Sequence, residues 1–336
     1  MDLSTNYLGL NLKNPLVPSA GPLSHNLDTA RRLEDAGASA IVMYSLFEEE
    51  IIDEEMALNR FLLYQDIGDP EASSYRPVPA AFKSAVERYL DQLAALKNSL
   101  DIPVIASLNG VTRSGWVQYG KDLQEAGADA LELNVYHIAT DPKESSATIE
   151  DHYLTLLEDL RGQVNLPIAM KIGPQFSALP HFVKRLEVAG AAGVVMFNRF
   201  YQPSIDLQTL QVVPNLVLST SAESLLAMRW IGILRNQVKL SLGATGGVHT
   251  ASDVLKMVLA GADVTQLCSA LLQHGPSVIT KILSGVSEWM TQNEYSSLAE
   301  MKGGVSQAHA IVPASFEHAN YLKVLDSYTV SSGVRV

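Results

Sequence analysis

The chain alternates between short runs of consecutive apolar residues and longer mixed stretches that are long enough to form helices. Four of the apolar runs begin two residues after the tripeptide Ala-Gly-Ala. These runs are Ala40–Met43, Ala130–Leu133, Gly193–Met196 and Val264–Leu267. A glycine that ends a helix, followed by a tight turn and then by aliphatic residues, is typical of an αβ unit. The pattern therefore predicts four such units.

A second set of apolar runs lies between the first four, and most of its members begin with proline. They are Pro15–Val17, Pro103–Ala106, Pro167–Met170 and Lys239–Leu242. Interleaving the two sets gives eight strands, each followed by a segment of helical length, which is the pattern of a parallel sheet. Eight such units predict an α/β fold of the TIM (β/α)₈ barrel type.

The remaining segments are additions to this barrel. The chain has 336 residues, whereas a plain barrel needs roughly 250, so we expect one domain over 1–336 with additions. They are an N-terminal hairpin within 1–13, an insertion at 46–80 after strand 2, a long loop at 198–221 after strand 6 and a C-terminal extension at 293–336. The acidic run at 48–55 is expected to be solvated surface, with a subunit contact or a lid over the barrel mouth as alternatives.

Composition narrows the classes of partner. A net charge of −12 repels phosphodiester backbones, so we expect a small-molecule ligand and no nucleic acid. No apolar run reaches the ~18 residues that would span a bilayer, so no membrane association is expected. The single cysteine, Cys268, excludes an intrachain disulfide and favours a cytoplasmic location.

Polar residues follow the predicted strands, where barrel enzymes build their sites. They are Ser19 to Gly21, Tyr44, Ser45, Ser107, Asn109, Asn134, His137, Lys171, Asn198, Arg199, Thr245 to Gly247, Gln266, Cys268 and Ser269. The glycines at 246 and 247, together with the turn at Cys268 and Ser269, predict a phosphate site, because glycines allow the backbone to approach an anion.

Two of these residues carry further chemistry. Lys171 ends strand 5 and would project into the barrel mouth, where it can neutralise an anion or form a Schiff base. His137 is either a general acid or base or a hydrogen-bonding surface residue. The histidines form no close ligand pair, so no metal site is expected. Motifs of hydrolase elbows and of NTP-binding loops are absent from the sequence.

With these residues in place, the chain resembles the dihydroorotate dehydrogenases, FMN-dependent TIM-barrel enzymes, and most closely their class 1 branch. The matching stretches are Asn14–Gly21, Leu131–Asn134, Met170–Ile172, Thr245–Val248, Thr265–Leu271 and Gly275–Pro276. The resemblance implies FMN as cofactor, a cytoplasmic homodimer, and oxidation of dihydroorotate to orotate in pyrimidine biosynthesis.

The resemblance also implies roles for single residues. Ala20 and Gly21 would lie against the flavin ring, with Ser45 near it. Asn134 and Asn198 would line the ring and the substrate, and Lys171 would approach the N1/O2 edge of the flavin. The phosphate would be held by Gly246, Gly247, Cys268 and Ser269.

The chain departs from the family mainly on the substrate side. His137 occupies the position of the catalytic cysteine, and we expect it to move the substrate proton. Tyr44 replaces a lysine, and the glycine-rich stretch is reduced at 218–222. The substrate is therefore dihydroorotate, a related ring or an activated alkene.

Two other classes of function stay open. One is a Schiff-base aldolase or phosphate-sugar lyase that uses Lys171. The other is a flavin-binding protein without dehydrogenase activity. The electron acceptor is also open, since one cysteine offers no evident iron–sulfur site.

Overall fold

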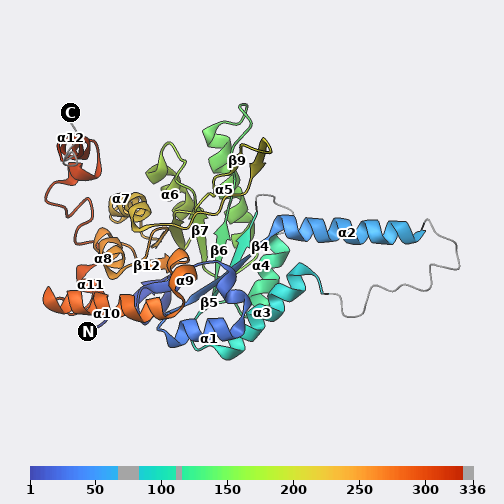
Figure 1. Cartoon of the computed structure of the whole chain (residues 1–336), viewed down its shortest axis with the longest axis horizontal. Coiled ribbons are helices and arrows are strands. Elements are labelled where there is room, and N and C mark those ends of the chain that lie inside the picture. Colours follow the sequence, from blue (N-terminus) through green and yellow to red (C-terminus); the bar gives the residue numbers. More distant parts are fainter. Residues whose placement is uncertain (67–82, 111–115, 328–336) are drawn as a thin grey trace.

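The structure, a computed structural model, describes residues 1–66, 83–110 and 116–327. Its centre is a ring of eight strands surrounded by helices (Figure 1). The strands are β3 (Leu16–Pro18), β4 (Ile41–Phe47), β5 (Val104–Asn109), β6 (Ala130–Asn134), β7 (Ile168–Ile172), β8 (Gly193–Met196), β11 (Ser241–Thr245) and β12 (Val264–Leu267). Each overlaps a predicted apolar run.

The eight strands form one parallel sheet in the order β3-β12-β11-β8-β7-β6-β5-β4. The two end strands meet where the amide and hydroxyl of Ser39 both donate to the carbonyl oxygen of Leu16, at 3.0 and 2.9 Å. This contact brings β4 beside β3 and completes the ring. The predicted TIM barrel is confirmed.

Helices cover the outside of the sheet. They are α1 (Leu27–Asp35), α3 (Ala85–Ser99), α4 (Trp116–Glu125), α5 (Ser146–Arg161), α6 (Leu179–Val188), α7 (Ser224–Leu234), α8 (Ala251–Ala260), α9 (Ser269–His274) and α10 (Ser277–Gln292). The helices α1, α4, α6 and α8 end at the Ala-Gly-Ala tripeptides. The glycine of each tripeptide has φ between 92° and 128°, a conformation that is strained for other residues. The tripeptides therefore mark real helix ends.

The N-terminal hairpin closes the bottom of the barrel. Strands β1 (Thr5–Tyr7) and β2 (Leu10–Leu12) pair in antiparallel fashion. Tyr7 and Leu12 are fully buried against the lower interior residues of the barrel, among them Val42, Ile105 and Val264. This apolar plug confirms the predicted hairpin and leaves the opposite end of the barrel for polar chemistry.

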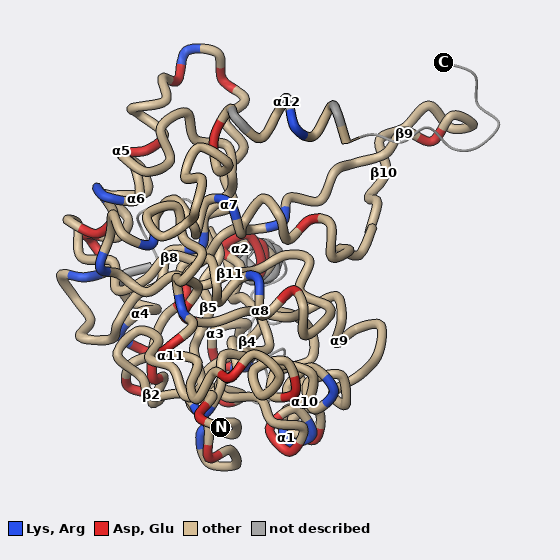
Figure 2. The backbone as a smooth tube through the Cα atoms, turned by 90° about the vertical axis from the view of Figure 1, so that its left-hand side faces the viewer, with Lys and Arg blue, Asp and Glu red and all other residues tan. Residues whose placement is uncertain are grey.

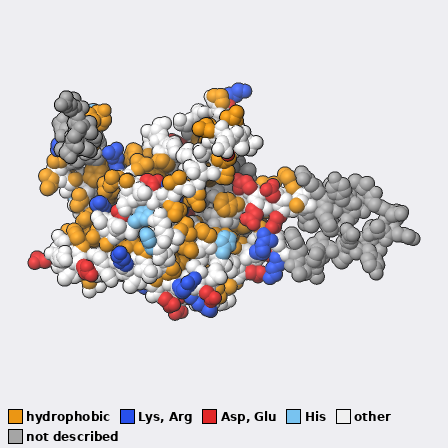
Figure 3. All heavy atoms as spheres, in the orientation of Figure 1, with side chains coloured by type: hydrophobic (Ala, Val, Ile, Leu, Met, Phe, Trp, Pro, Cys, Tyr) orange, Lys and Arg blue, Asp and Glu red, His pale blue; other side chains and the backbone are white. Residues whose placement is uncertain are grey.

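The insertion after strand 2 begins with α2 (Glu48–Asp66), which extends away from the barrel (Figure 1). The acidic run at its start is not simply solvated surface, because Glu48 is buried and Arg88 of α3 forms ion pairs with Glu50 and Glu54. Figure 3 shows these opposite charges side by side where α2 meets the barrel. The predicted insertion continues to residue 80, and its part beyond residue 66 lies outside the described residues.

The long loop after strand 6 contains a small hairpin that the sequence pattern did not indicate. Strands β9 (Ser204–Asp206) and β10 (Gln211–Val213) pair over three residues each, too few to produce a recognisable alternation. The hairpin stands away from the barrel at the upper right of Figure 2.

The C-terminal extension runs over the barrel exterior. It contains α11 (Leu298–Met301), the 3₁₀ turn η3 (Pro313–Phe316) and α12 (Ala319–Asp326). Two further 3₁₀ turns lie in the barrel, η1 (Pro22–His25) before α1 and η2 (Ser221–Glu223) before α7. The Phe316 ring lies directly on Gly232 of α7, where an added Cβ would come within 2.4 Å of the ring. None of the described helices combines the length and the apolar character needed to cross a bilayer.

Candidate active site at the barrel mouth

A cavity of about 960 Å³ opens at the carboxyl ends of the strands. Every strand of the barrel contributes to its wall: Ser19, Tyr44, Ser45, Asn109, Asn134, Lys171, Phe197, Thr245, Gln266 and Cys268 stand at or just beyond strand ends. The volume lies near the upper limit of ordinary ligand pockets, roughly 300–1,000 Å³. The cavity is therefore large enough for a cofactor together with a small substrate.

The structure brings most of the predicted site residues together. Those that line the cavity are Ala20, Gly21, Ser45, Asn134, Lys171, Asn198, Gly246, Gly247, Cys268 and Ser269. The strand-end residues Ser19, Asn109, Arg199, Thr245 and Gln266, which had no assigned role, line it as well.

His137 does not line the cavity. Its Nε2 is 3.8 Å from Glu144 Oε2, and its ring centroid lies 6.5 Å from that of His152. Its neighbour Tyr136 takes the inward position instead, with its ring 4.2 Å from the ring of Phe200. The expected placement of His137 beside the ligand is therefore not found, because the loop presents the preceding side chain to the cavity.

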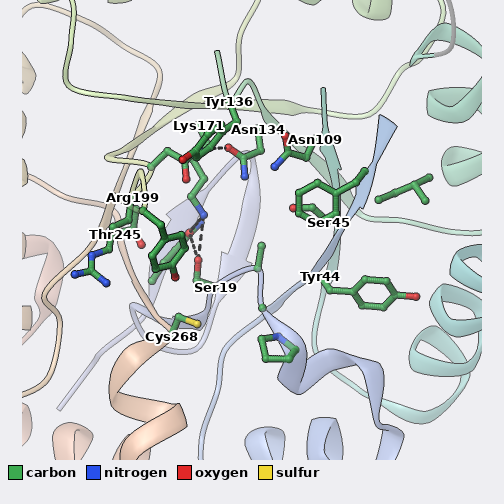
Figure 4. A pocket seen from close by; sticks show the side chains of 18 of the residues that line it. Ser19, Tyr44, Ser45, Asn109, Asn134, Tyr136, Lys171, Arg199, Thr245 and Cys268 are labelled. Atoms are coloured by element: carbon green, nitrogen blue, oxygen red, sulfur yellow. Dashed lines mark hydrogen bonds between the residues drawn. The ribbon is translucent and has the colours of Figure 1, made fainter. Parts of the chain in front are cut away.

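The floor of the cavity is a buried polar network around Lys171 (Figure 4). Lys171 Nζ donates to Glu132 Oε1 at 3.0 Å and to Ser19 Oγ at 3.1 Å. Gln266 Nε2 donates to the other oxygen of Glu132 at 2.6 Å. All the charged atoms here are shielded from solvent, since the side chains of Lys171 and Glu132 are 6% and 1% exposed. The ammonium group is therefore fixed in place and balanced by a carboxylate.

Backbone geometry shapes one end of the cavity for an anion. Gly246 and Gly247 follow β11 with φ of 85° and 78°. Nothing lies within 4 Å of a Cβ added to Gly246, whereas a Cβ on Gly247 would come within 2.4 Å of the Ser224 nitrogen. Successive backbone amides in such a turn form an anion-binding concavity. This end fits the predicted phosphate site.

The loops after strands 6 and 8 complete the same end. The amide of Ser219 donates to Ser269 Oγ at 3.1 Å, and Ser219 Oγ lies 3.1 Å from His249 Nε2. Ser219 belongs to residues 218–222, the stretch that has fewer glycines than in the family. It nevertheless lines the cavity. Its role was missed because its partners are distant in sequence.

Cys268 faces the cavity across from Gly21. A Cβ on Gly21 would come within 3.0 Å of Cys268 Sγ, so only glycine allows this approach without a shift of the sulfur. Burial raises the pKa of the Cys268 thiol, and the nearby Lys171 ammonium opposes this effect. The thiol is therefore uncharged near neutral pH and contributes packing.

Amide groups line the side of the cavity next to Tyr136. Asn198 Nδ2 donates to Asn134 Oδ1 at 2.5 Å, which fixes the orientation of both side chains. Asn109 stands at the end of β5, opposite Asn134 in the strand register. Figure 4 shows Asn109 and Asn134 close together at this wall. These amides offer neutral donors and acceptors to a ligand.

The adjacent wall, at β4, carries aromatic rings. A register shift between Val42 and Ser45 in β4 allows both Tyr44 and Ser45 to line the cavity. The Tyr44 ring stacks on His25 at a centroid distance of 3.5 Å. Burial raises the pKa of Tyr44, to which the Glu50 carboxylate adds, and burial lowers the pKa of His25. Both rings are therefore neutral near pH 7.

Two arginines at the rim are already paired with carboxylates. Arg88 Nη2 lies 2.6 Å from Glu54 Oε1, and Arg199 Nη2 lies 3.1 Å from Glu223 Oε1. Arg88 comes from helix α3 rather than from a strand end, so no local pattern in the sequence places it here. Within the described ranges, no group of three or more His, Cys, Asp or Glu side chains is arranged to hold a metal ion.

Comparison with known proteins gives one family and several relatives. The family described as Dihydroorotate dehydrogenase matches residues 82–290. The chain is similar to the catalytic subunit of dihydroorotate dehydrogenase B (NAD(+)) of Thermoplasma acidophilum, with 25% identity over 90% of this chain and 98% of that protein. It is also similar to dihydroorotate dehydrogenase A (fumarate) of Lactiplantibacillus plantarum, with 27% identity over 88% of this chain and 96% of that protein. A third relative is the NAD-dependent dihydropyrimidine dehydrogenase subunit PreA of Escherichia coli, with 24% identity over 96% of this chain and 80% of that protein.

Proposed function

The chain belongs to the dihydroorotate dehydrogenase family, and on this premise we propose that it is an FMN-dependent oxidoreductase that acts on a CH–CH bond of a small ring. Dihydroorotate is the first substrate to consider, because two of the relatives carry it in their names. We further propose that residues 1–336 act as a single FMN-binding domain in a cytoplasmic homodimer.

The observation that carries the proposal is the pairing of a buried ammonium with an anion-shaped backbone turn in one cavity. Lys171 lies at the floor, and Gly246 and Gly247 lie at one end. A flavin mononucleotide has an anionic phosphate and a ring that becomes negatively charged on reduction, so it matches both features. When bound, FMN supplies the redox chemistry by accepting a hydride.

Residues of the chain would bind the flavin and orient its ring. Ala20, Gly21 and Ser45 would contact the flavin ring, and Lys171 would neutralise its electron-rich edge. The backbone at Gly246 and Gly247 would hold the phosphate, together with Cys268 and Ser269.

The reaction also needs a group that moves a proton. In the proposed step one substrate carbon gives up a hydride, the adjacent carbon gives up a proton, and a C=C bond forms between them. The role of His137 in this step stays a prediction that its present position does not support. Tyr136 lines the cavity beside the amides and is the group that we propose for proton transfer: its phenolate would accept the proton when the substrate is oxidised, and its phenol would return it in the reverse reaction.

A neutral ring is a second candidate substrate, and specific contacts favour it. Arg88 and Arg199 are already held by glutamates, and Glu49 and Glu50 add negative charge to the wall. The ligand-facing amides Asn109 and Asn134 suit ring carbonyls and N–H groups. An uncharged dihydropyrimidine fits this wall better than a carboxylate, in keeping with the name of the Escherichia coli relative.

A binding comparison separates the two substrates. With FMN-loaded protein, we expect uracil to perturb the flavin spectrum at lower concentration than orotate does if the ring is neutral. The reverse order would favour dihydroorotate. Replacing Glu223 by Gln frees Arg199 and should improve orotate binding while leaving uracil binding unchanged.

A Schiff-base reaction is disfavoured by the contacts of Lys171. Its Nζ donates to both Glu132 and Ser19, and these contacts would have to break before the nitrogen could attack a carbonyl carbon.

The cofactor is tested by reconstitution. We expect purified protein to bind about one FMN per chain, and Lys171→Met to weaken this binding by at least about tenfold. Protein that is colourless and stays colourless after incubation with FMN would contradict the proposal.

A further inference from the structure

Glu132 is a buried acidic residue at the centre of strand β6. On β6 it lies between Ala130, which packs on the apolar plug, and Asn134 at the cavity wall. Its carboxylate is 1% exposed. An acidic side chain at this depth needs a reason, because charged groups are almost never fully buried unless paired.

The partner of Glu132 is Lys171. Oε1 of Glu132 accepts from Lys171 Nζ at 3.0 Å, and its Oε2 accepts from Gln266 Nε2 at 2.6 Å. Gln266 Oε1 in turn lies 3.1 Å from Ser19 Oγ, which also contacts the ammonium. Both oxygens of the carboxylate are therefore hydrogen-bonded, and Lys171 lines the cavity whereas Glu132 does not.

Barrel stability does not explain this pair. Replacing a buried ion pair by apolar residues of similar volume is often neutral or stabilising, and the layer below is built from Val, Ile and Ala. Glu132 nevertheless affects a residue of that layer, Tyr7. Burial raises the pKa of Tyr7, and the Glu132 carboxylate raises it further. Glu132 therefore lies close enough to the apolar plug to influence Tyr7.

We propose that Glu132 is a positioning residue that offsets the charge of Lys171 and thereby makes a flavin in the cavity harder to reduce. This inference rests on the proposed function. A ring that gains negative charge on reduction is attracted by the Lys171 ammonium, and a carboxylate 3.0 Å behind that ammonium weakens the attraction because it acts over a similar path of low dielectric constant.

The direct test is the midpoint potential of the FMN-loaded protein, measured by equilibration with a reference dye. Glu132→Gln keeps the shape and removes the charge. We expect it to favour the reduced flavin over the oxidised one by about tenfold, a shift of about 30 mV to more positive potential for a two-electron couple. Glu132→Asp keeps the charge and should stay within about twofold of the wild type.

A matched control is available in Glu150. It is also buried and also ion-paired, with Arg185 Nη1 at 2.9 Å, but on the barrel exterior. Glu150→Gln breaks a comparable pair, so it should lower stability without moving the potential. A potential that moves equally in both variants would show a general structural effect and overturn the inference.

If Glu132→Gln does not fold because Lys171 is left unpaired, the same charge can be removed in a protein that also lacks the lysine. Lys171→Met removes the cation, and the double variant Glu132→Gln/Lys171→Met has no buried charge at all. We expect the double variant to have a more positive potential than Lys171→Met alone. Equal potentials in these two proteins would overturn the inference.

The outcomes separate the inference from the function on which it rests. If wild-type protein does not take up FMN, the proposed function fails and the inference fails with it. If FMN binds and the potential of Glu132→Gln equals that of the wild type, the inference alone fails.

Discussion

At the scale of single residues, the thiol of Cys268 reports on the cavity. It is the only cysteine of the chain and lines the cavity at the end where the phosphate is proposed to bind. Because burial raises its pKa, the thiolate fraction near neutral pH is smaller than for an ordinary thiol, whose pKa is ≈ 8.5. We expect slow alkylation by iodoacetamide near neutral pH, with a rate that rises at higher pH than it does for an ordinary thiol.

This expectation is checked by mass spectrometry of the single modified site. Bound FMN should protect the thiol, and protein unfolded in urea should react as fast as free cysteine. Native protein that reacts near neutral pH as fast as the unfolded protein would show that Cys268 is not buried in solution.

A second prediction concerns Tyr136 and His137, which are adjacent in sequence but differ in position. Since only Tyr136 lines the cavity, we expect Tyr136→Phe to lower substrate-dependent flavin reduction by about 10²–10⁴-fold, the usual worth of general acid–base catalysis. His137→Asn should change it by less than about threefold. The opposite order in stopped-flow experiments would show that the loop turns His137 inward when substrate binds.

The sequence predicted those site residues that follow directly from strand ends. Asn134 and Lys171 could be placed because parallel strands end at one rim of a barrel. Tyr136 and His137 could not be told apart, since a loop has no periodicity that fixes which side chain points inward. Ser219 and Arg88 reach the cavity through long-range packing, for which a single sequence carries no signal.

At the scale of elements, the turn after β11 makes a quantitative prediction. Both glycines have positive φ, but only at Gly247 does an added Cβ meet backbone, the Ser224 nitrogen at 2.4 Å. Gly246→Ala should cost about 1–2 kcal/mol of unfolding free energy from backbone strain alone. Gly247→Ala should cost about 1–3 kcal/mol more, because the turn must move off α7.

Denaturant unfolding of the flavin-free proteins measures this difference. FMN affinity provides a second readout, since a methyl group on Gly246 would occupy the opening in which the phosphate is proposed to lie. Equal stability of the two variants, or an unchanged FMN affinity of Gly246→Ala, would be inconsistent with this geometry.

The helices and strands of the barrel were largely predictable, because the sequence patterns that mark them extend over only a few residues. An Ala-Gly-Ala tripeptide ends a helix and precedes a strand within a few residues, and the glycines adopt the backbone conformation that the pattern requires. The β9–β10 hairpin was not predicted, because its strands are only three residues long and their apolar residues Ile205 and Val212 are exposed rather than buried in a core. The pairing of α2 with α3 depends on Arg88, thirty-four positions from Glu54, which no local pattern reveals.

At the scale of the whole molecule, the β9–β10 hairpin bears on the proposed homodimer. Its side chains Ile205, Leu207, Leu210 and Val212 are between 64% and 83% exposed. Contiguous exposed apolar groups of this kind mark interaction surfaces more often than free surface. Because the loop also carries Asn198 and Arg199 of the cavity, a second copy that packs on it would order the cavity wall.

Light scattering after size-exclusion chromatography tests this proposal. We expect a dimer, and we expect the double variant Leu207→Ser/Leu210→Ser to weaken dimerisation by at least about tenfold. Ile311→Ser is the control, since Ile311 is fully exposed on the C-terminal segment and should leave the dimer intact. A wild-type protein that is monomeric at micromolar concentration would contradict the dimer.

The proposed function requires that the cavity holds FMN and uses it to oxidise a CH–CH bond of a small ring. This is tested by the visible absorption spectrum of FMN-loaded protein before and after anaerobic addition of dihydroorotate and, separately, of an uncharged dihydropyrimidine. We expect the flavin absorption to bleach with one of the two compounds, and the Tyr136→Phe variant to bind FMN but to bleach far more slowly. A flavin spectrum that neither compound changes would contradict it.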